Sequence, residues 1–332
     1  MNLAKIFINE WGRLRSGWRL SLFALVYIVL QLIIGSISFL TVNHSGLGLP
    51  PGGYFENAIF RLVLLSSALL AGYICTRFLE GLPWLAIGLT LHRNWMKHFL
   101  LGSLIGAGAL AFAAAIATAG GGLSFSLVRT SAILLVFRAL ISAAALFILA
   151  ALAEEALFRG YPLQTLTRAR LAWLGVLLTS IPFAAVHLRN PNVVQGFTFL
   201  NTALAGVWFA VAYLRTRSLW FPLGLHWAWN WTLDSILGLP VSGMKISPQS
   251  LLTGLDLGPS WLTGGSYGIE GGVAGTIALV VATVFVWRAR FVSAAPEMLA
   301  LTSHENPAAK SVSVVPKEAE APRPLFGRIG EE

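Results

Sequence analysis

Long apolar runs separated by short polar segments make up most of the chain. A run of about 17 to 25 apolar residues is long enough to cross a bilayer as a helix. Eight segments meet this description: 20–42, 59–77, 98–119, 131–158, 172–188, 197–214, 219–237 and 272–288. The pattern predicts an all-α fold, a polytopic membrane helix bundle of about eight transmembrane helices.

The two ends of the chain differ from the bundle, which we expect to be one domain over residues 20–290. Residues 1–19 interleave Trp, Phe and Ile with Arg, as an amphipathic interfacial helix does. The first apolar run is longer than the core of a signal peptide, so we interpret it as a retained anchor. Residues 291–332 are rich in Pro, Ala, Glu and Ser, which predicts a disordered cytoplasmic tail.

Composition and charge support a membrane protein. Hydrophobic residues make up 56% of the chain and charged residues 11%, about half the charged fraction of soluble domains. Lys and Arg gather in alternate loops, so the positive-inside rule predicts that both termini are cytoplasmic. The net charge of +9 then reflects orientation in the membrane, and we expect the lipid bilayer and no nucleic acid as partner. The compact chain suggests an integral, multi-pass protein of a bacterial plasma membrane.

Three apolar segments contain polar groups that a purely structural span would avoid. They read ALAEEALFRGYP at 151–162, PFAAVH at 182–187 and HWAWNWTLD at 226–234. An ionisable side chain at the centre of a bilayer costs about 3 kcal/mol or more unless it is paired or hydrated, so such residues indicate a functional site. The single cysteine, Cys75, excludes an internal disulfide and a cysteine zinc site.

Helical spacing separates the charges of the first segment. Glu155 and Arg159 are four residues apart and share a face, which predicts a buried ion pair. Glu154 lies about 100° around the helix and is available for chemistry. Pro162 removes a hydrogen bond to Phe158 and predicts a kink near this site. The alternative is that all three charges form a salt-bridge network at the cytoplasmic rim.

The two histidine segments also have two interpretations. His226, Asn230 and Asp234 are spaced by four and lie on one stripe, where they are able to hold a water, a metal or an oxyanion, or to form ordinary interhelical hydrogen bonds. His187 is either a rim histidine or, through a bend at Pro182, part of the same site. Counted from the cytoplasmic side it lies about 24 Å deep, against about 10 Å for His226.

The ordered motifs resemble those of the CPBP family of intramembrane proteases, which includes type II CAAX prenyl endopeptidases and relatives linked to bacteriocin immunity. The resemblance covers about residues 150–235 and is carried by Glu154-Glu155-x-x-x-Arg159, Phe183-x-x-x-His187 and His226-x-x-x-Asn230. It implies a bundle with a cytosol-accessible cavity in the bilayer. It also implies that an activated water hydrolyses a peptide bond there.

The resemblance further implies a role for each matched residue. Glu154 and His187 would activate the water, with Glu154 as the general base. His226 and Asn230 would stabilise the oxyanion, while Glu155 and Arg159 would hold the first helix. Family members are usually called metalloproteases, and Zn²⁺ or another divalent metal held by His187, His226 and Glu154 suits the ligand chemistry. The HExxH signature is absent, so accounts with and without a metal stay open.

We therefore expect an intramembrane endopeptidase that acts on membrane-bound or lipid-modified, CAAX-like peptides. The alternative from another class is a non-catalytic peptide-binding or bacteriocin-immunity protein of the membrane. A proton-coupled transporter is disfavoured, because the sequence shows neither repeat symmetry nor paired half-helices. The Gly-rich segment 258–272 and its Glu270 have no role assigned from the sequence.

Overall fold

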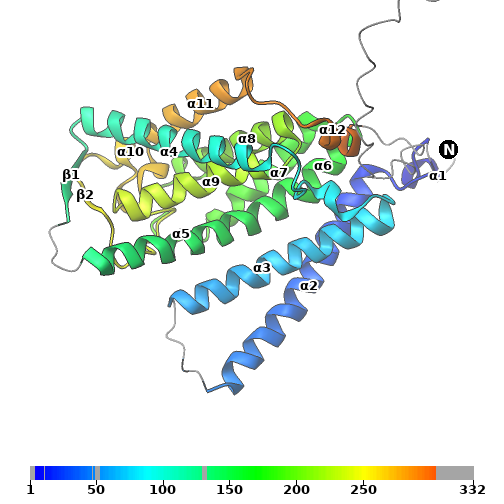
Figure 1. Cartoon of the computed structure of the whole chain (residues 1–332), viewed down its shortest axis with the longest axis horizontal. Helices are drawn as coiled ribbons and strands as arrows, with labels where there is room; N and C mark the ends of the chain where they lie inside the picture. Colours follow the sequence, from blue (N-terminus) through cyan, green and yellow to red (C-terminus); the bar gives the residue numbers. More distant parts are fainter. Residues whose placement is uncertain (1–3, 11, 47, 49–52, 129–132, 304–332) are drawn as a thin grey trace, which may run out of the picture.

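The computed structural model describes residues 4–10, 12–46, 48, 53–128 and 133–303. Nearly all of the regular structure is helical (Figure 1). The α-helices are α1 Ala4–Phe7, α2 Ser16–His44, α3 Tyr54–Ile74, α4 Trp95–Ala119, α5 Ile133–Glu155, α6 Tyr161–Arg168, α7 Ala172–His187, α8 Phe197–Thr216, α9 Trp220–Trp231, α10 Ser260–Thr263, α11 Val273–Arg288 and α12 Pro296–Thr302. Three π-helical turns, η1 Cys75–Leu79, η3 Ala156–Gly160 and η4 Thr232–Ile236, extend α3, α5 and α9. The 3₁₀ turns are η2 Trp84–Ile87, η5 Gly265–Tyr267 and η6 Ile269–Gly271.

The expected membrane bundle is confirmed. All eight apolar segments fall on helices, and five helical segments are long and apolar enough to cross a membrane: Ser16–His44, Tyr54–Leu79, Trp95–Ala119, Ile133–Arg168 and Phe197–Thr216. The other three segments form shorter helices than predicted, because α7 and α11 have 16 residues each and α9 has 12. The cytoplasmic placement of both termini stays a prediction.

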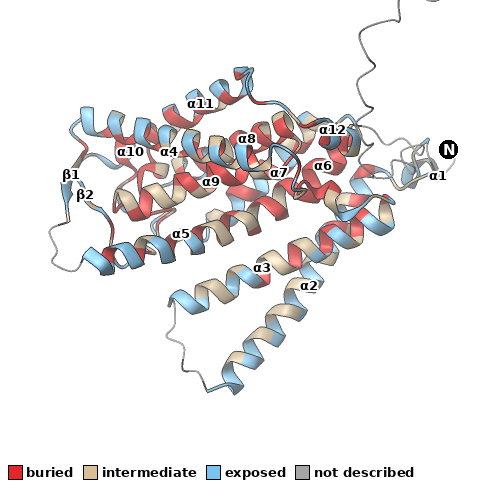
Figure 2. Ribbon diagram, in the orientation of Figure 1, coloured by how far each residue is buried: buried red, intermediate tan, exposed pale blue. Residues whose placement is uncertain are grey.

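The core lies where α4, α8, α9 and α11 meet, as the buried residues of Figure 2 show. Helices α4 and α9 approach with their backbones in contact. A Cβ atom added to Gly224 on α9 would lie 2.2 Å from the Phe99 carbonyl oxygen on α4, and one added to Gly106 would lie 2.4 Å from the Leu225 carbonyl oxygen. Small residues allow this close crossing in membrane bundles, and it fixes the position of α9.

Helices α2 and α3 form a hairpin that diverges from the rest of the bundle (Figure 1). Most of α2 is accessible, and its buried residues, Ser16, Arg19 and Phe23, all lie near its start. At that end Arg19 forms an ion pair with Glu80 at 3.1 Å, with both side chains buried. Helix α2 is therefore anchored to the bundle near its start, while α3 also contacts α5, and the apolar surface of α2 suits contact with lipid.

A small antiparallel sheet departs from the all-α prediction. Strand β1, Leu123–Leu127, pairs with β2, Leu252–Asp256, in the register Leu123↔Asp256. Each strand has only five residues, and they are far apart in the sequence. Such short segments leave little periodicity to detect.

The two ends of the described chain contain short helices. In the N-terminal segment a four-residue α1 is followed by a turn with Gly12 at φ 69°, and α2 begins at Ser16, while the interfacial placement of this segment stays a prediction. Within the predicted tail, α12 is ordered because Met298 is buried, and Arg215 donates a hydrogen bond of 2.7 Å to the Val292 carbonyl. The remainder of the predicted disordered tail, 304–332, lies outside the described residues.

Candidate active site

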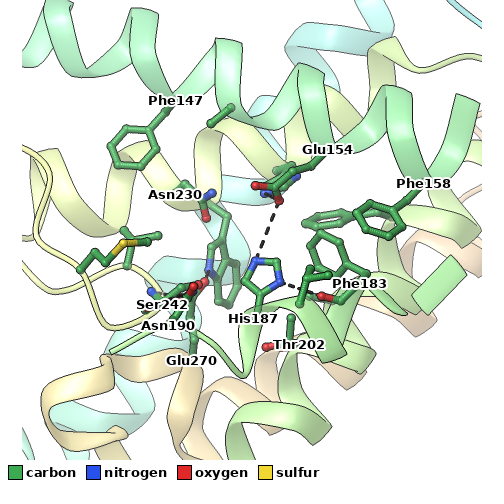
Figure 3. Close-up of a pocket in the computed structure, with 18 of the residues that line it drawn as sticks. Phe147, Glu154, Phe158, Phe183, His187, Asn190, Thr202, Asn230, Ser242 and Glu270 are labelled. Carbon is green, nitrogen blue, oxygen red and sulfur yellow. Dashed lines mark hydrogen bonds and ion pairs between the residues drawn. The ribbon is translucent and has the colours of Figure 1, made fainter. Parts of the chain in front are cut away.

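A cavity of about 490 Å³ lies between α3, α5, α7, α8, α9 and the loop around residues 241–246. The four residues expected to be catalytic all line it: Glu154, His187, His226 and Asn230. Figure 3 shows Glu154 and His187 on facing sides of the cavity, with Asn230 beside them. Segments far apart in the sequence thus contribute polar groups to one mainly apolar pocket.

Glu154 and the two histidines converge on a single point. Glu154 Oε2 lies 3.9 Å from His187 Nε2 and 3.7 Å from His226 Nε2. This oxygen is buried and has no hydrogen-bond partner among the described residues. A buried polar atom without a partner is unusual in proteins. The three atoms therefore mark a position where a small polar species, such as a water molecule, can be held.

Each imidazole is oriented by a hydrogen bond from its other nitrogen. His187 Nδ1 lies 2.7 Å from the carbonyl oxygen of Phe183 (Figure 3), and His226 Nδ1 lies 2.9 Å from Glu155 Oε1. Since both partners only accept, Nδ1 carries a proton in each ring. Nε2 therefore faces the cavity, where it accepts a hydrogen bond in the neutral ring and donates one in the protonated ring.

Glu155 and Arg159 form a fully buried ion pair behind the cavity. Arg159 Nη1 lies 3.2 Å from Glu155 Oε1, and both side chains are 0% exposed. Arg159 also donates to the Gly206 carbonyl of α8 at 3.1 Å, and its guanidinium lies 4.5 Å from the centre of the Phe183 ring of α7. With the Glu155–His226 bond, this pair connects the end of α5 to α7, α8 and α9. The π-turn η3 follows Glu155 directly, a feature that often accompanies functional sites.

Arg61 is a site residue that the sequence analysis missed. Its Nη1 lies 3.0 Å from Glu154 Oε1, so Glu154 is not free of ion pairs as its helical position suggested. Helical spacing gives no information on a partner 93 residues away. A signal was present, however, because Arg61 is an ionisable residue within the apolar run 59–77, and the rule that selected Glu154 applies to it equally.

The predicted stripe of His226, Asn230 and Asp234 is divided. His226 and Asn230 line the cavity, but Asp234 accepts hydrogen bonds from the backbone of Ile246 at 2.9 Å and Ser247 at 3.1 Å. The α-helical spacing does not continue to Asp234, because residues 232–236 are π-helical. Asp234 therefore holds a loop of the cavity wall.

His187 and His226 lie close to the same carboxylate oxygen, although the sequence predicts different depths for them. The residues from Phe221 to His226 are all buried. Helix α9 therefore begins in the interior of the protein, and counting residues along two separate helices does not show how close their side chains lie. His187 reaches the same point from the last turn of α7, which has Pro182 inside the helix.

Glu270, unassigned from the sequence, supports another wall of the cavity. Its Oε1 accepts a hydrogen bond from Trp229 Nε1 at 2.9 Å. Its Oε2 accepts two from Ser242, at 2.6 Å from the backbone nitrogen and 3.0 Å from the hydroxyl. Glu270, Ser242 and Trp229 all line the cavity. The Gly-rich segment thus carries a carboxylate that clamps the 241–246 loop against α9.

The side chains predicted to bind a metal, His187, His226 and Glu154, are suitable donors, but they are not arranged as a metal site. Two imidazole nitrogens and a carboxylate are typical zinc ligands, and a hydrogen bond from the other ring nitrogen, like those to Phe183 and Glu155, commonly orients such histidines. Within the part of the chain that the structure describes, however, no group of three or more His, Cys, Asp or Glu side chains is arranged to hold a metal ion. The zinc set of His187, His226 and Glu154 stays a prediction.

Comparison with known proteins agrees with this site. Residues 135–232 match the family model of the Rce1-like type II CAAX prenyl endopeptidases. This chain carries an Rce1-like domain. The predicted family is thereby confirmed, and the matched region contains the residues of all three motifs, Glu154, Glu155, Arg159, Phe183, His187, His226 and Asn230, but not Asp234. Arg61 and Glu270 lie outside the Rce1-like domain.

A relative of uncharacterised function shares part of the sequence. The uncharacterized 24.3 kDa protein of Escherichia coli is 40% identical over 84 residues, which are 24% of this chain and 37% of that protein. The chain thus spans just over a third of the curated relative it matches. Together with the apolar helices, the Rce1-like domain supports an integral membrane protein and, in general terms, an intramembrane endopeptidase.

Proposed function

We propose that this protein is an intramembrane endopeptidase in which Glu154 and His187 activate a water molecule. The observation that carries the proposal is the convergence of Glu154 Oε2 with both Nε2 atoms, at 3.9 Å from His187 and 3.7 Å from His226. These separations are longer than direct hydrogen bonds, and a water lying beside the three atoms would be able to bridge them. Support also comes from the Rce1-like domain, which contains all three residues.

The first step is attack on the peptide carbonyl. Glu154 Oε2 takes a proton from the water while His187 Nε2 accepts its second hydrogen bond and aims the oxygen at the substrate carbon. A base within hydrogen-bonding reach typically contributes about 100- to 10,000-fold to the rate. The product of this step is a tetrahedral intermediate with a negative oxygen.

The second step is loss of the amine. The side-chain amide of Asn230 and a protonated His226 donate hydrogen bonds to the oxyanion, and fixed donors of this kind contribute about 100- to 1,000-fold each. The proton held by Glu154 passes to the leaving nitrogen, the carbon–nitrogen bond breaks, and the carboxylate is regenerated. Glu155 keeps His226 in place through Nδ1.

We propose a membrane-bound or lipid-modified, CAAX-like peptide as the substrate. Apart from Asn57, Arg61 and Glu154, the residues that α3 and α5 contribute to the cavity are apolar, among them Phe60, Leu64 and Phe147, and both helices are apolar enough to span a membrane. Other elements add polar side chains to the lining, among them Asn201, Ser242 and Glu270. An amphiphilic chain suits this mixed lining, with its apolar part against Phe60, Leu64 and Phe147 and its peptide bonds near the polar groups.

The test is peptide cleavage by purified protein in detergent, with products identified by mass spectrometry. Prenylated and unprenylated forms of one peptide are compared, with and without a chelator. We expect the wild type to cleave the lipidated peptide and Glu154→Ala to leave it intact. Peptide binding without any product would favour the non-catalytic binding or immunity protein, and loss of cleavage on chelation would favour the metal-dependent account.

A further inference from the structure

The two oxygens of the Glu154 carboxylate have different surroundings. Oε1 accepts a hydrogen bond from Arg61 Nη1 at 3.0 Å. Oε2 has no hydrogen-bond partner among the described residues and faces His226 Nε2 at 3.7 Å and His187 Nε2 at 3.9 Å. Arg61 thus divides the group into one anchored oxygen and one open oxygen.

This division matters because the terminal torsion of a glutamate is soft. Rotation about χ3 has a broad energy profile, so hydrogen bonds decide which way the carboxylate turns. Among the hydrogen bonds of the described residues, that from Arg61 is the one that holds Oε1 of Glu154. Without it, Oε2 is no longer held toward the two histidines.

Arg61 also supplies the charge that an ionised Glu154 needs. The side chains of Arg61 and Glu154 are only 21% and 16% exposed, and a carboxylate removed from water is costly unless it is paired. The hydrogen bonds of Arg159 are directed to Glu155 and to the Gly206 carbonyl, so Arg61 is the arginine in direct contact with Glu154. The arginine from α3 fills this requirement.

The position of Arg61 depends on α3 lying against α5. At the start of α3, the Tyr54 hydroxyl donates a hydrogen bond to the Ser142 carbonyl of α5. The Arg61–Glu154 pair is a second connection between the same two helices. Arg61 is therefore presented to the cavity by a helix outside the Rce1-like domain.

We infer that Arg61 is a positioning residue for the proposed general base: it anchors Oε1 of Glu154 so that Oε2 meets the water held by His187 and His226. The inference rests on the proposed function. Arg61 acts through Glu154 and not on the substrate, so its removal affects the rate of turnover more than the binding of peptide.

The test measures kcat and KM for one cleaved peptide with the wild type, Arg61→Met, Arg61→Lys and Arg77→Met. Methionine keeps the length of the side chain and removes charge and donors. Arg77 is the matched control, because it is an exposed arginine on η1, the continuation of α3. We expect Arg61→Met to lower kcat about 10- to 100-fold with KM within about twofold. Arg61→Lys should recover most of kcat, and Arg77→Met should match the wild type.

If the wild type is active, either of two results for Arg61→Met would contradict the role of Arg61 without contradicting the proposed function. One is an unchanged kcat in Arg61→Met, and the other is a raised KM with unchanged kcat, which would make Arg61 a substrate contact. If Arg61→Met does not fold, Arg61→Ala takes its place under the same criteria. A wild type that folds and releases no product instead overturns the proposed function, and this inference with it.

Discussion

Glu155 Oε1 lies 2.9 Å from His226 Nδ1 and 3.2 Å from Arg159 Nη1, so one oxygen joins the end of α5 to α9 and to its own next turn. Glu155 is 0% exposed. The residue beside the proposed base thus has an architectural role that also fixes the orientation of an imidazole.

Removing the charge of Glu155 should destabilise the fold. Glu155→Gln leaves the buried Arg159 guanidinium without its counter-charge, and breaking a buried pair costs about 3 to 5 kcal/mol. We expect a lower yield of folded protein and a clear fall in the midpoint of thermal unfolding in detergent. A midpoint equal to that of the wild type would contradict the role assigned to this pair.

Glu154→Gln should separate activity from stability. The amide cannot accept the water proton, so turnover should fall by at least about 100-fold. The pair with Arg61 borders the cavity, with side chains 21% and 16% exposed, and the amide oxygen of the glutamine still accepts a hydrogen bond from Arg61. The unfolding midpoint should therefore stay near that of the wild type, in contrast to Glu155→Gln. Substantial cleavage by the variant would rule out Glu154 as the base.

Glu270 and Ser242 offer a graded test of the cavity wall. Glu270→Ala leaves the Trp229 indole and two Ser242 donors without their acceptor, which should cost about 1 to 3 kcal/mol. Ser242→Ala removes the hydroxyl but keeps the backbone donor, so about 0.5 to 1.5 kcal/mol is expected. Denaturation in mixed detergent micelles measures both. Equal losses for the two variants would show that the carboxylate does not clamp the loop.

The close crossing of α4 and α9 should not tolerate a methyl group. In Gly224→Ala the new Cβ would lie 2.2 Å from the Phe99 carbonyl oxygen. The helices would have to separate, and overpacking of this kind typically costs about 1 to 3 kcal/mol. The control is Gly108→Ala on α4, where an added Cβ would have no described atom of another helix within 4 Å. The first variant should lower thermal stability and activity, and the second should change neither.

The sequence predicts the parts of the site that depend on position along one helix. The i, i+4 spacing of Glu155 and Arg159 is sufficient to predict their pair, because both side chains belong to the same short stretch of backbone. It does not predict Arg61 beside Glu154, or Ser242 beside Glu270, because these contacts depend on how distant segments pack. Asp234 shows the opposite error, because the i, i+4 spacing predicts that it shares a face with His226 and Asn230. A π-helical turn over 232–236, which the sequence pattern does not reveal, moves Asp234 away from that face.

The shortness of certain elements explains the remaining differences in the fold. Hydropathy predicts α9 as a full span, although α9 has 12 residues and a buried start, because a protein interior and a lipid interior are equally apolar. The β1–β2 sheet has five residues in each strand. Its pairing is fixed by the surrounding loops and not by a strong strand pattern of its own.

The origin of Arg61 in α3 has a practical consequence for protein engineering. A minimal fragment cut to residues 135–232 retains all seven motif side chains, yet it lacks the Arg61 guanidinium that contacts the proposed base and the Glu270 carboxylate that holds the 241–246 loop. Transplanting the motif-bearing helices into another scaffold would therefore yield an incomplete site, unless the α2–α3 hairpin and the Gly-rich segment were included.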